Sequence, residues 1–283
     1  MDQTEKSVMH QFIQLAVLED IGDGDHTSLS TIPKDIHGKA HILMKEAGIL
    51  AGINVAKAIF AEIDPKLELV VFFEDGQEVN TGDIVIEVNG SVHSILLAER
   101  LVLNVMQRMS GIATITNKVV KSLATTHTRV LDTRKTTPGL RFLEKEAVRI
   151  GGGVNHRFGL YDMILIKDNH VDFAGGIKNA LDAANEYRKL HNKDIDIEIE
   201  VRSIQELNEV LVHGGVERIL LDNFDIQTLK EAVQIVDGRF ITEASGGITF
   251  ENAFEYASCG VDFISMGALT HSVKSIDISL KAI

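Results

Sequence analysis

The sequence predicts an α/β protein in two parts. Up to about residue 111, short β-type runs are separated by glycine-rich turns and flanked by helical segments, which is typical of an α+β unit. From residue 112 onward, β-type runs alternate with helical patterns. Strands joined by helical crossovers predict a parallel sheet or barrel with its helices on the outside.

The first part contains a helical N-terminal segment, three strands and a long helix. The predicted strands cover residues 41–44, 67–73 and 84–88. A helix is predicted over residues 94–111, because its apolar side chains recur at every fourth position. A final run, Ile276–Ala282, alternates apolar and polar residues at period two and predicts a strand beyond the barrel series.

The second part contains six predicted strands. They cover residues 128–133, 163–168, 195–201, 218–223, 240–245 and 261–267. Helical patterns cover the segments between them, and one of these helices is expected to start near Thr249. Because a complete βα barrel has eight strands, either the barrel is incomplete or a strand lies in the helical stretch near residue 115.

Length and composition exclude several classes of protein. A chain of 283 residues with 45% hydrophobic residues can bury one large or two medium cores. Its net charge of −13 argues against a general binder of nucleic acid or of anionic membranes. No uncharged apolar run reaches the roughly 18 residues of a membrane span. The single Cys259 and the lack of a secretory signal at the start predict a cytoplasmic location.

Reactive side chains occur at the carboxyl ends of five successive predicted strands. These residues are Arg134 and Lys135, Lys167, Glu200, Asp222 and Ser245. The corresponding face of βα barrels carries the active site, because its loops converge on one ligand. The alternative is that charged residues simply mark the ends of strands.

The third strand of the series places acids on one face. Asp196, Glu198 and Glu200 alternate with aliphatic residues, and the helices outside a barrel favour an inward direction for the acids. Buried carboxylates need cations, donors or a metal ion, and Lys135 and Lys167 are the candidate partners. The alternative is an edge strand with a solvated acidic face.

Positive charge and glycines suggest an anion site. Residues 129–167 hold eight Lys and Arg against four Asp and Glu, a local charge of +4, which leaves −17 for the remainder. We interpret Lys145 and Arg149 within this segment as a solvated helix face. Ser245-Gly246-Gly247 and Met266-Gly267-Ala268 each follow a strand and present backbone N–H groups that can bind phosphate. Tight turns without a ligand are the alternative reading of both glycine segments.

At these residues the sequence closely resembles the quinolinate phosphoribosyltransferase family. The likeness covers residues 132–141, 151–170, 198–201, 220–224, 243–248 and 265–272, and it extends to residues 19–28 and 99–114. It implies an N-terminal α/β sandwich over residues 1–111, joined by a returning strand at 272–283. It also implies an incomplete α/β barrel of six to seven strands over residues 112–271. The family acts as a homodimer or larger assembly with a shared active site.

The resemblance also implies roles for individual residues. Quinolinate would be held by Thr133, Arg134, His156, Arg157 and Lys167, with Arg100 contributed by the neighbouring subunit. Lys135, Glu200 and Asp222 would act on the ribose and pyrophosphate of phosphoribosyl pyrophosphate (PRPP), with Mg²⁺ bound through PRPP and Glu200 and Asp222 as candidate ligands. The 5′-phosphate would be bound by Ser245, Gly246, Gly247, Met266, Gly267 and Ala268.

The implied activity is transfer of phosphoribose from PRPP to quinolinate with loss of CO₂, giving nicotinate mononucleotide for NAD synthesis. Three other functions remain open at this point. Lys167 could form a Schiff base in a lyase. The chain could bind a small anion without catalysis, or it could be the family's paralogue associated with molybdenum transport.

Overall fold

The computed structural model describes residues 3–283, and side chains from residue 7 onward. It contains two compact units. The first comprises the chain up to Asn117 together with Thr137–Gly152 and Ser272–Ile283, and the second comprises Lys118–Thr136 and Gly153–His271. Within the described residues, no helix is long and apolar enough to cross a membrane.

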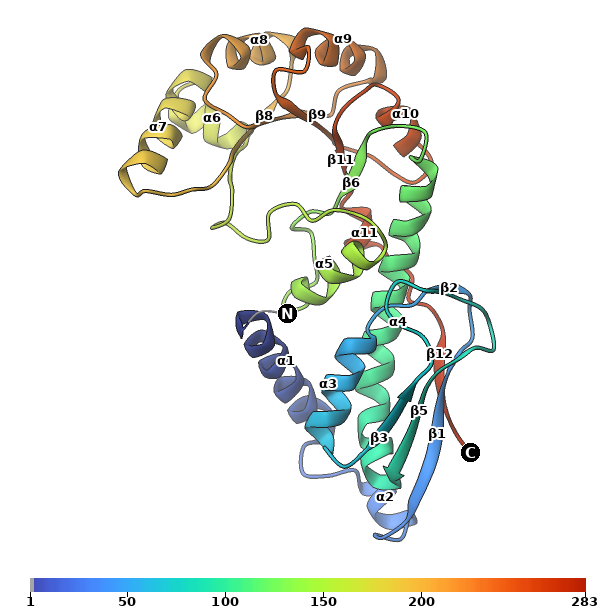
Figure 1. The fold of residues 1–283 in the computed structure, drawn as a ribbon. Helices are drawn as coiled ribbons and strands as arrows, with labels where there is room; N and C mark the ends of the chain where they lie inside the picture. Colours follow the sequence, from blue (N-terminus) through green and yellow to red (C-terminus); the bar gives the residue numbers. More distant parts are fainter. Residues whose placement is uncertain (1–2) are drawn as a thin grey trace. The chain divides into compact units, whose positions relative to one another are not determined.

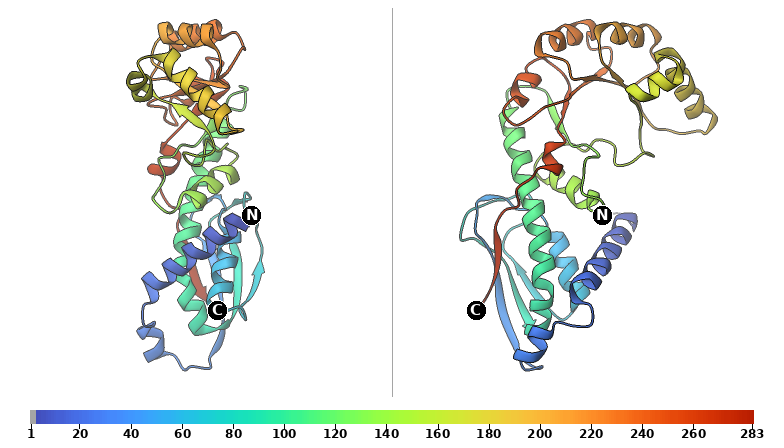
Figure 2. Two further views of the ribbon diagram at one scale, coloured as in Figure 1. Left: turned by 90° about the vertical axis from the view of Figure 1, so that its left-hand side faces the viewer. Right: turned by 180° about the vertical axis from the view of Figure 1, so that it is seen from behind.

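The first unit is built on an antiparallel four-stranded sheet (Figure 1). Its strand order is β12 (Ile278–Ala282), β1 (His37–Met44), β5 (Ile84–Ser91) and β3 (Glu68–Val71). The expected C-terminal strand is confirmed, because β12 pairs with β1 in a register that places Ile42 opposite Leu280. Figure 2 shows these two strands side by side. The remaining elements are the small sheet of β2 (Gly48–Ile49) and β4 (Glu78–Val79) and the helices α1 (Gln3–Ile21), α2 (His26–Thr31), α3 (Ile53–Ile63), α4 (Val92–Ser122) and α5 (Arg141–Ile150).

Alternation along the strands and periodicity along the helices create the core of this unit. Ala40, Ile42 and Met44 on one face of β1 are buried, as period two requires. On α4, Val102 and Met106 lie one turn apart and are also buried. The buried faces of β1 and α4 therefore follow the periods of a strand and a helix.

The second unit is a curved, fully parallel sheet of six strands, so the predicted strand count is confirmed. The strand order is β6 (Arg129–Leu131), β11 (Phe263–Ser265), β10 (Ile241–Ser245), β9 (Arg218–Asp222), β8 (Ile197–Val201) and β7 (Ile164–Ile166). The sheet stays open between β6 and β7, where a single bridge joins Leu131 to Val154. The barrel is therefore incomplete, and the alternative strand near residue 115 is wrong because that segment lies within α4.

Short helices follow the strands of the second unit, and the figure shows α7, α8 and α9 along the outer side of the sheet (Figure 1). Their bounds are α6 (Asp168–Ala174), α7 (Ile177–Leu190), α8 (Ile204–His213), α9 (Ile226–Val236), α10 (Ala253–Ala257) and α11 (Ala268–His271). The helix expected to start near Thr249 begins only at Ala253 and has five residues. Asn252 accepts the N–H of Thr249 through its side chain, which holds residues 249–252 in a turn instead.

The two units divide the chain differently from the expected boundary at residues 111 and 112. Helix α4 runs without interruption through this point, and the division falls near residue 117. Residues 137–152, expected in the barrel part, belong to the first unit together with α5. Lys145 on α5 is only 1% exposed, so the expected solvated face was wrong for this residue, whereas Arg149 is exposed.

Candidate active site

The predicted reactive residues lie at the carboxyl ends of the barrel strands. Thr133, Arg134 and Lys135 follow β6, and Lys167 follows β7 directly. Glu200, Asp222 and Ser245 lie at or next to the last position of their strands. Because all six strands are parallel, these ends meet at one edge of the sheet.

Lys167 and Glu200 form an ion pair at this edge. The Lys167 Nζ atom lies 3.6 Å from Glu200 Oε2, and Glu200 is 8% exposed whereas the lysine side chain is half exposed. Burial raises the pKa of Glu200, the negative charge of Asp222 raises it further, and Lys167 opposes both effects. The carboxylate of Glu200 therefore interacts with one negative charge, that of Asp222, and with one positive charge, that of Lys167.

Asp222 is held by two donors, one from the last residue of β10 and one from the residue that follows Asp222 in the chain. Ser245 donates its hydroxyl to Asp222 Oδ1 at 2.5 Å, and Asn223 donates its amide to Oδ2 at 2.5 Å. Ser245 and Asp222 are paired in the parallel register of β10 and β9, which brings them together. The predicted proximity of strand-end residues is thus explained by the sheet register.

The glycines after β10 adopt conformations that other residues rarely adopt. Gly246 has φ +94° and Gly247 has φ +61°. A Cβ atom on Gly246 would overlap the side chain of Asn223, so the two loops approach closely only because this position is glycine. The turn can present backbone N–H groups to an anion. Because α10 and α11 are so short, helix dipoles do not explain the predicted phosphate site.

Lys135 lies against the second glycine segment. A Cβ on Gly267 would be 3.0 Å from Lys135 Cδ, and Thr270 donates its hydroxyl to the backbone carbonyl of Lys135 at 2.8 Å. Met266 is buried, and Ala268 begins α11. The loop after β6 and the loop after β11 are therefore joined, with the exposed Lys135 beside Gly267.

Arg134 and Arg157 place two positive charges near each other. Arg157 is 9% exposed and donates from Nη1 to the carbonyl of Met163 at 3.4 Å. Burial lowers the pKa of Arg157, and the positive charge of Arg134 lowers it further. Two neighbouring guanidinium groups create a site that favours a bound carboxylate or phosphate.

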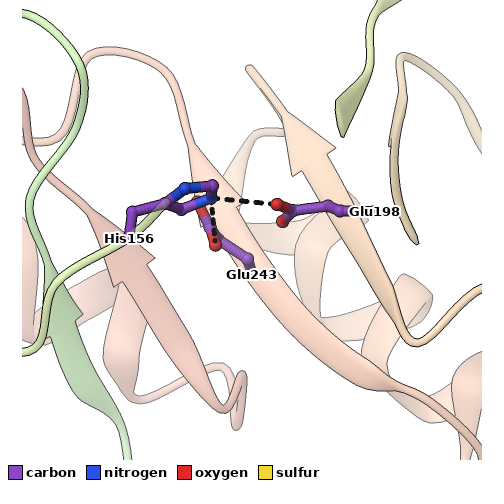
Figure 3. Close-up of side chains that lie close together, drawn as sticks. All are labelled: His156, Glu198 and Glu243. Atoms are coloured by element: carbon purple, nitrogen blue, oxygen red, sulfur yellow. Dashed lines mark ion pairs between the residues drawn. The ribbon is translucent and has the colours of Figure 1, made fainter. Parts of the chain in front are cut away.

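His156 lies between two buried carboxylates (Figure 3). Its Nε2 atom is 2.9 Å from Glu198 Oε2 and 3.5 Å from Glu243 Oε2. Lysines were the candidate partners for the acids of this strand, and Lys167 does pair with Glu200, whereas the partner of Glu198 is His156. Glu243, two residues before Ser245, was not among the residues that the sequence pattern singled out. Of the three acids expected to point inward, Glu198 and Glu200 are buried, whereas Asp196 lies exposed before the strand begins.

Arg100 lies in the first unit, where it is exposed on α4.

For a divalent cation, Glu200 and Asp222 supply the hard carboxylate oxygens that Mg²⁺ prefers. The charge of Asp222 raises the pKa of Glu200, and a cation bound by both would relieve that repulsion. These residues therefore fit the expected role of magnesium ligands.

A pocket of about 340 Å³ lies beside β7. Apolar residues such as Leu160 and Ile164 form most of its lining, and Arg157 and His170 reach it. His170 accepts the backbone N–H of Lys167 through Nδ1. The pocket does not include Lys135, Glu200, Asp222 or the glycine turns, so its apolar space is distinct from the charged strand ends.

An open parallel barrel with clustered cations, paired acids and two glycine turns at its strand ends defines an enzyme class that acts on small phosphorylated substrates. The chain belongs to the quinolinate phosphoribosyltransferase family: residues 25–110 match the N-terminal domain and residues 112–281 match the C-terminal domain of "Quinolinate phosphoribosyl transferase".

Curated relatives and solved structures agree with this family. The chain is 47% identical to "Quinolinate phosphoribosyltransferase [decarboxylating] 2, mitochondrial" of Nicotiana glauca, over 96% of this chain and 82% of the relative. It is 42% identical to the "Probable nicotinate-nucleotide pyrophosphorylase [carboxylating]" of Bacillus subtilis (strain 168), over 98% and 93%. The structure of the nicotinate-nucleotide pyrophosphorylase from Francisella tularensis superimposes with a TM-score of 0.90 at 38% identity, over 98% of this chain and 96% of that chain.

Proposed function

We propose that the protein transfers the phosphoribosyl group of PRPP to quinolinate, with loss of CO₂, to form nicotinate mononucleotide and pyrophosphate in NAD biosynthesis. The observation that carries this proposal is the convergence of Arg134, Arg157 and Lys167 with Glu200 and Asp222 at one end of the barrel. Quinolinate carries two carboxylates and PRPP carries more negative charge. A site that binds both must supply positive charge, and these three cationic side chains supply it.

The cationic residues would bind and orient quinolinate. Arg134 and Arg157 can each grip a carboxylate with two parallel N–H groups, and Lys167 supplies a point charge. Thr133 and His156 would complete this part of the site. Lys135 and the turns at Ser245–Gly247 and Met266–Ala268 would bind the phosphate groups of PRPP, which would bring the ribose C1 next to the pyridine nitrogen of quinolinate.

The acids would stabilise the transition state of the glycosyl transfer. As pyrophosphate leaves, positive charge develops at the ribose C1, and the carboxylates of Glu200 and Asp222 favour that charge directly or through the ribose hydroxyls. The lone pair of the pyridine nitrogen then forms the new C–N bond while the C–O bond to pyrophosphate breaks. Mg²⁺, held by Glu200 and Asp222 as well as by PRPP, would neutralise part of the negative charge of the departing pyrophosphate.

Decarboxylation would follow from the product of the first step. The C–N bond makes the ring a pyridinium, whose positive nitrogen stabilises the carbanion left at C2 when the adjacent carboxylate departs as CO₂. A proton from solvent or from a site residue then forms a new C2–H bond in place of the lost C–C bond. The protein therefore needs no separate electron sink.

We further propose that the enzyme is a cytoplasmic homodimer or larger assembly in which Arg100 acts in the site of the neighbouring subunit. The resemblance of residues 99–114 to the family supports this placement, and the exposure of Arg100 leaves its guanidinium accessible to a partner. An arginine from the second subunit would add one more positive charge for the substrate carboxylates.

The assay that tests the proposal incubates purified protein with quinolinate, PRPP and Mg²⁺ and measures CO₂ and pyrophosphate together. Release of both in equal amounts is expected. Faster turnover of nicotinate than of quinolinate would overturn the specificity, and no turnover would favour an anion-binding protein or the paralogue associated with molybdenum transport. Borohydride trapping of Lys167 with a carbonyl substrate would support a lyase, but Lys167 is half exposed and paired with Glu200, unlike an activated Schiff-base lysine.

A further inference from the structure

The contacts of His156 join three separate strands of the barrel to one loop. The backbone N–H of His156 donates to Asp132 Oδ1 at 2.8 Å, just after β6. Its ring lies between Glu198 of β8 and Glu243 of β10, and the side chain is 7% exposed (Figure 3). Among the described residues, no other side chain forms an ion pair with Glu198, whereas Glu243 also pairs with Arg218 at 3.0 Å.

The loop that contains His156 crosses the open side of the barrel. Between β6 and β7 the sheet has no strand ladder, and the bridge of Val154 to Leu131 is isolated. The same loop carries Arg157, which follows His156 directly and is expected to bind the substrate. Beyond the two backbone hydrogen bonds at Val154, side-chain contacts hold this loop in position.

The ring of His156 links the buried acids to the backbone of Arg157. The N–H of Arg157 donates to His156 Nδ1 at 2.7 Å, so Nδ1 has a free electron pair and the ring proton is on Nε2, facing the carboxylates. Burial alone would lower the pKa of His156, but Glu198 and Glu243 raise it above its ordinary value. The hydrogen bond that Nδ1 accepts from Arg157 opposes a second ring proton, so the geometry keeps the single ring proton on Nε2.

This proton position also decides against a metal site. His156, Glu198 and Glu243 offer three ligand atoms within 4.8 Å of one another. A metal ion would need the electron pair of Nε2, which carries the proton as long as Nδ1 accepts the N–H of Arg157. Arg218 also neutralises part of the negative charge that would attract a cation. The cluster is thus better suited to hold a side chain in place.

We propose that Glu198 and Glu243 are positioning residues for quinolinate binding, because they fix the ring of His156, which in turn fixes the backbone at Arg157. This inference rests on the proposed function. It assigns a role to two acids that lie below the site and are not expected to touch the substrate. The property that the clamp requires at position 198 is a side-chain oxygen in contact with the ring Nε2 atom, and not a negative charge.

Steady-state kinetics of two variants at position 198 tests this role. Glu198→Ala removes the carboxylate that lies 2.9 Å from the ring Nε2 atom, so the KM for quinolinate is expected to rise about tenfold while the KM for PRPP changes less than about twofold. Glu198→Gln keeps a carbonyl acceptor and is expected to restore the KM for quinolinate to within about threefold of the wild type. Glu231→Ala, on the exposed face of α9, is the matched control and should leave both constants unchanged. Equal effects on both substrates, or no effect of Glu198→Ala, would overturn the proposal.

An NMR measurement on the wild-type protein tests the clamp without any turnover. With ¹⁵N-labelled histidine, and with His156→Gln to assign the signal, the ring of His156 should carry its proton on Nε2 and none on Nδ1 at pH 7. A ring protonated at Nδ1 would contradict the link to Arg157. This result stands even if Glu198→Ala does not fold. If the wild-type enzyme fails to release CO₂ from quinolinate, the proposed function is wrong, but the NMR spectrum still decides the arrangement of the clamp.

Discussion

Glu200 is the residue whose ionisation most directly links the geometry of the site to its chemistry. Its carboxylate must be ionised to favour positive charge on the ribose, yet burial and Asp222 raise its pKa. Activity that depends on ionised Glu200 is therefore lost as the pH falls through this raised pKa. The acidic limb of the pH profile should lie at a higher pH than it would for an ordinary glutamate.

Asp222→Asn provides the first test at the scale of single residues. Removing the negative charge lowers the pKa of Glu200, so the acidic limb of kcat/KM should move to lower pH. The maximal rate should also fall by about 100-fold, because one of the two acids that stabilise the transition state is lost. A profile of kcat/KM over about pH 5 to 9 measures both the position of the acidic limb and the height of the plateau.

Asp237→Asn is the matched control for this charge change. Asp237 is exposed at the end of α9, and its positive φ of 49° is also accessible to asparagine. Its profile should coincide with that of the wild type. An acidic limb that stays in place in Asp222→Asn would show that Glu200 does not set it.

The location of a single residue could be predicted from the sequence where the period of an element or the end of a strand determines it. Glu200, Asp222 and Ser245 were found because each lies at the end of an apolar strand, and the structure brings these strand ends to one edge. The contact of His156 with Glu198 and Glu243 could not be predicted in this way, because three distant segments meet only after the barrel curves. The burial of Lys145 was missed for a related reason: a charged residue on an amphipathic helix usually points to solvent.

At the scale of loops, Gly246 is the position where the backbone itself limits function. Gly246→Ala would force a Cβ into Asn223, a neighbour of Asp222, and it would strain a φ of +94°. The turn must then shift, so the KM for PRPP should rise at least about tenfold while the KM for quinolinate changes less than about threefold. Steady-state kinetics with each substrate varied in turn measures this difference.

Gly238→Ala separates strain from loss of phosphate binding. Gly238 also has a positive φ, +66°, but a Cβ there would meet no atom within 4 Å, and it precedes β10 at the opposite end from Ser245. This variant should lose some stability and keep both KM values. If Gly246→Ala behaves in the same way, the turn after β10 does not bind phosphate.

Among the helices of the first unit, a buried ion pair joins α4 to α5. Arg108 donates from Nε and Nη2 to Glu144 Oε1 at 2.9 and 2.6 Å, and it also donates to Thr137 at 2.9 Å. Glu144 is 0% exposed, so a charge left without this partner would be costly. Arg108→Met should therefore lower the free energy of unfolding by about 3 kcal/mol in urea titrations at neutral pH.

Two further variants check the cause of that loss. Arg149→Met removes an exposed arginine paired with Glu146 and should cost less than about 1 kcal/mol. Combining Arg108→Met with Glu144→Leu removes both charges and should recover much of the stability. A double variant as unstable as Arg108→Met would mean that the lost contacts of Arg108, and not the unpaired Glu144, cause the loss.

The same pair explains why the expected domain boundary differs from the compact units. Sequence patterns predicted α5 as part of the βα series because it follows β6 in the chain. Its buried contacts, however, are with α4: a Cβ on Gly151 would overlap the backbone of Ala113, and Glu144 pairs with Arg108. Local periodicity predicts that a helix forms, whereas the partner that covers it depends on contacts distant in the sequence.

For the whole molecule, the distribution of charge accounts for a protein that is acidic overall and binds anions. The net charge is −13, but residues 129–167 carry +4 and include Arg134, Lys135, Arg157 and Lys167. Cations concentrated at the strand ends attract multiply charged substrates, while the acidic remainder repels large polyanions. If a neighbouring subunit adds Arg100 to this region, the complete site exists only in the assembly, and an isolated subunit is inactive.

Mixing two inactive variants tests the shared site. Arg100→Ala removes the residue that one subunit would contribute to its partner, and Lys135→Ala removes a residue of the barrel itself, so each homodimer should be inactive. In a hybrid dimer, the barrel of the Arg100→Ala chain keeps Lys135 and receives an intact Arg100 from its partner. When the chains are unfolded, mixed in equal amounts and refolded, half of the dimers are hybrids with one intact site of two, so about a quarter of the wild-type activity should return. Activity that stays at the level of the separate variants, with hybrid dimers detected by mass spectrometry, would place Arg100 outside the partner's site.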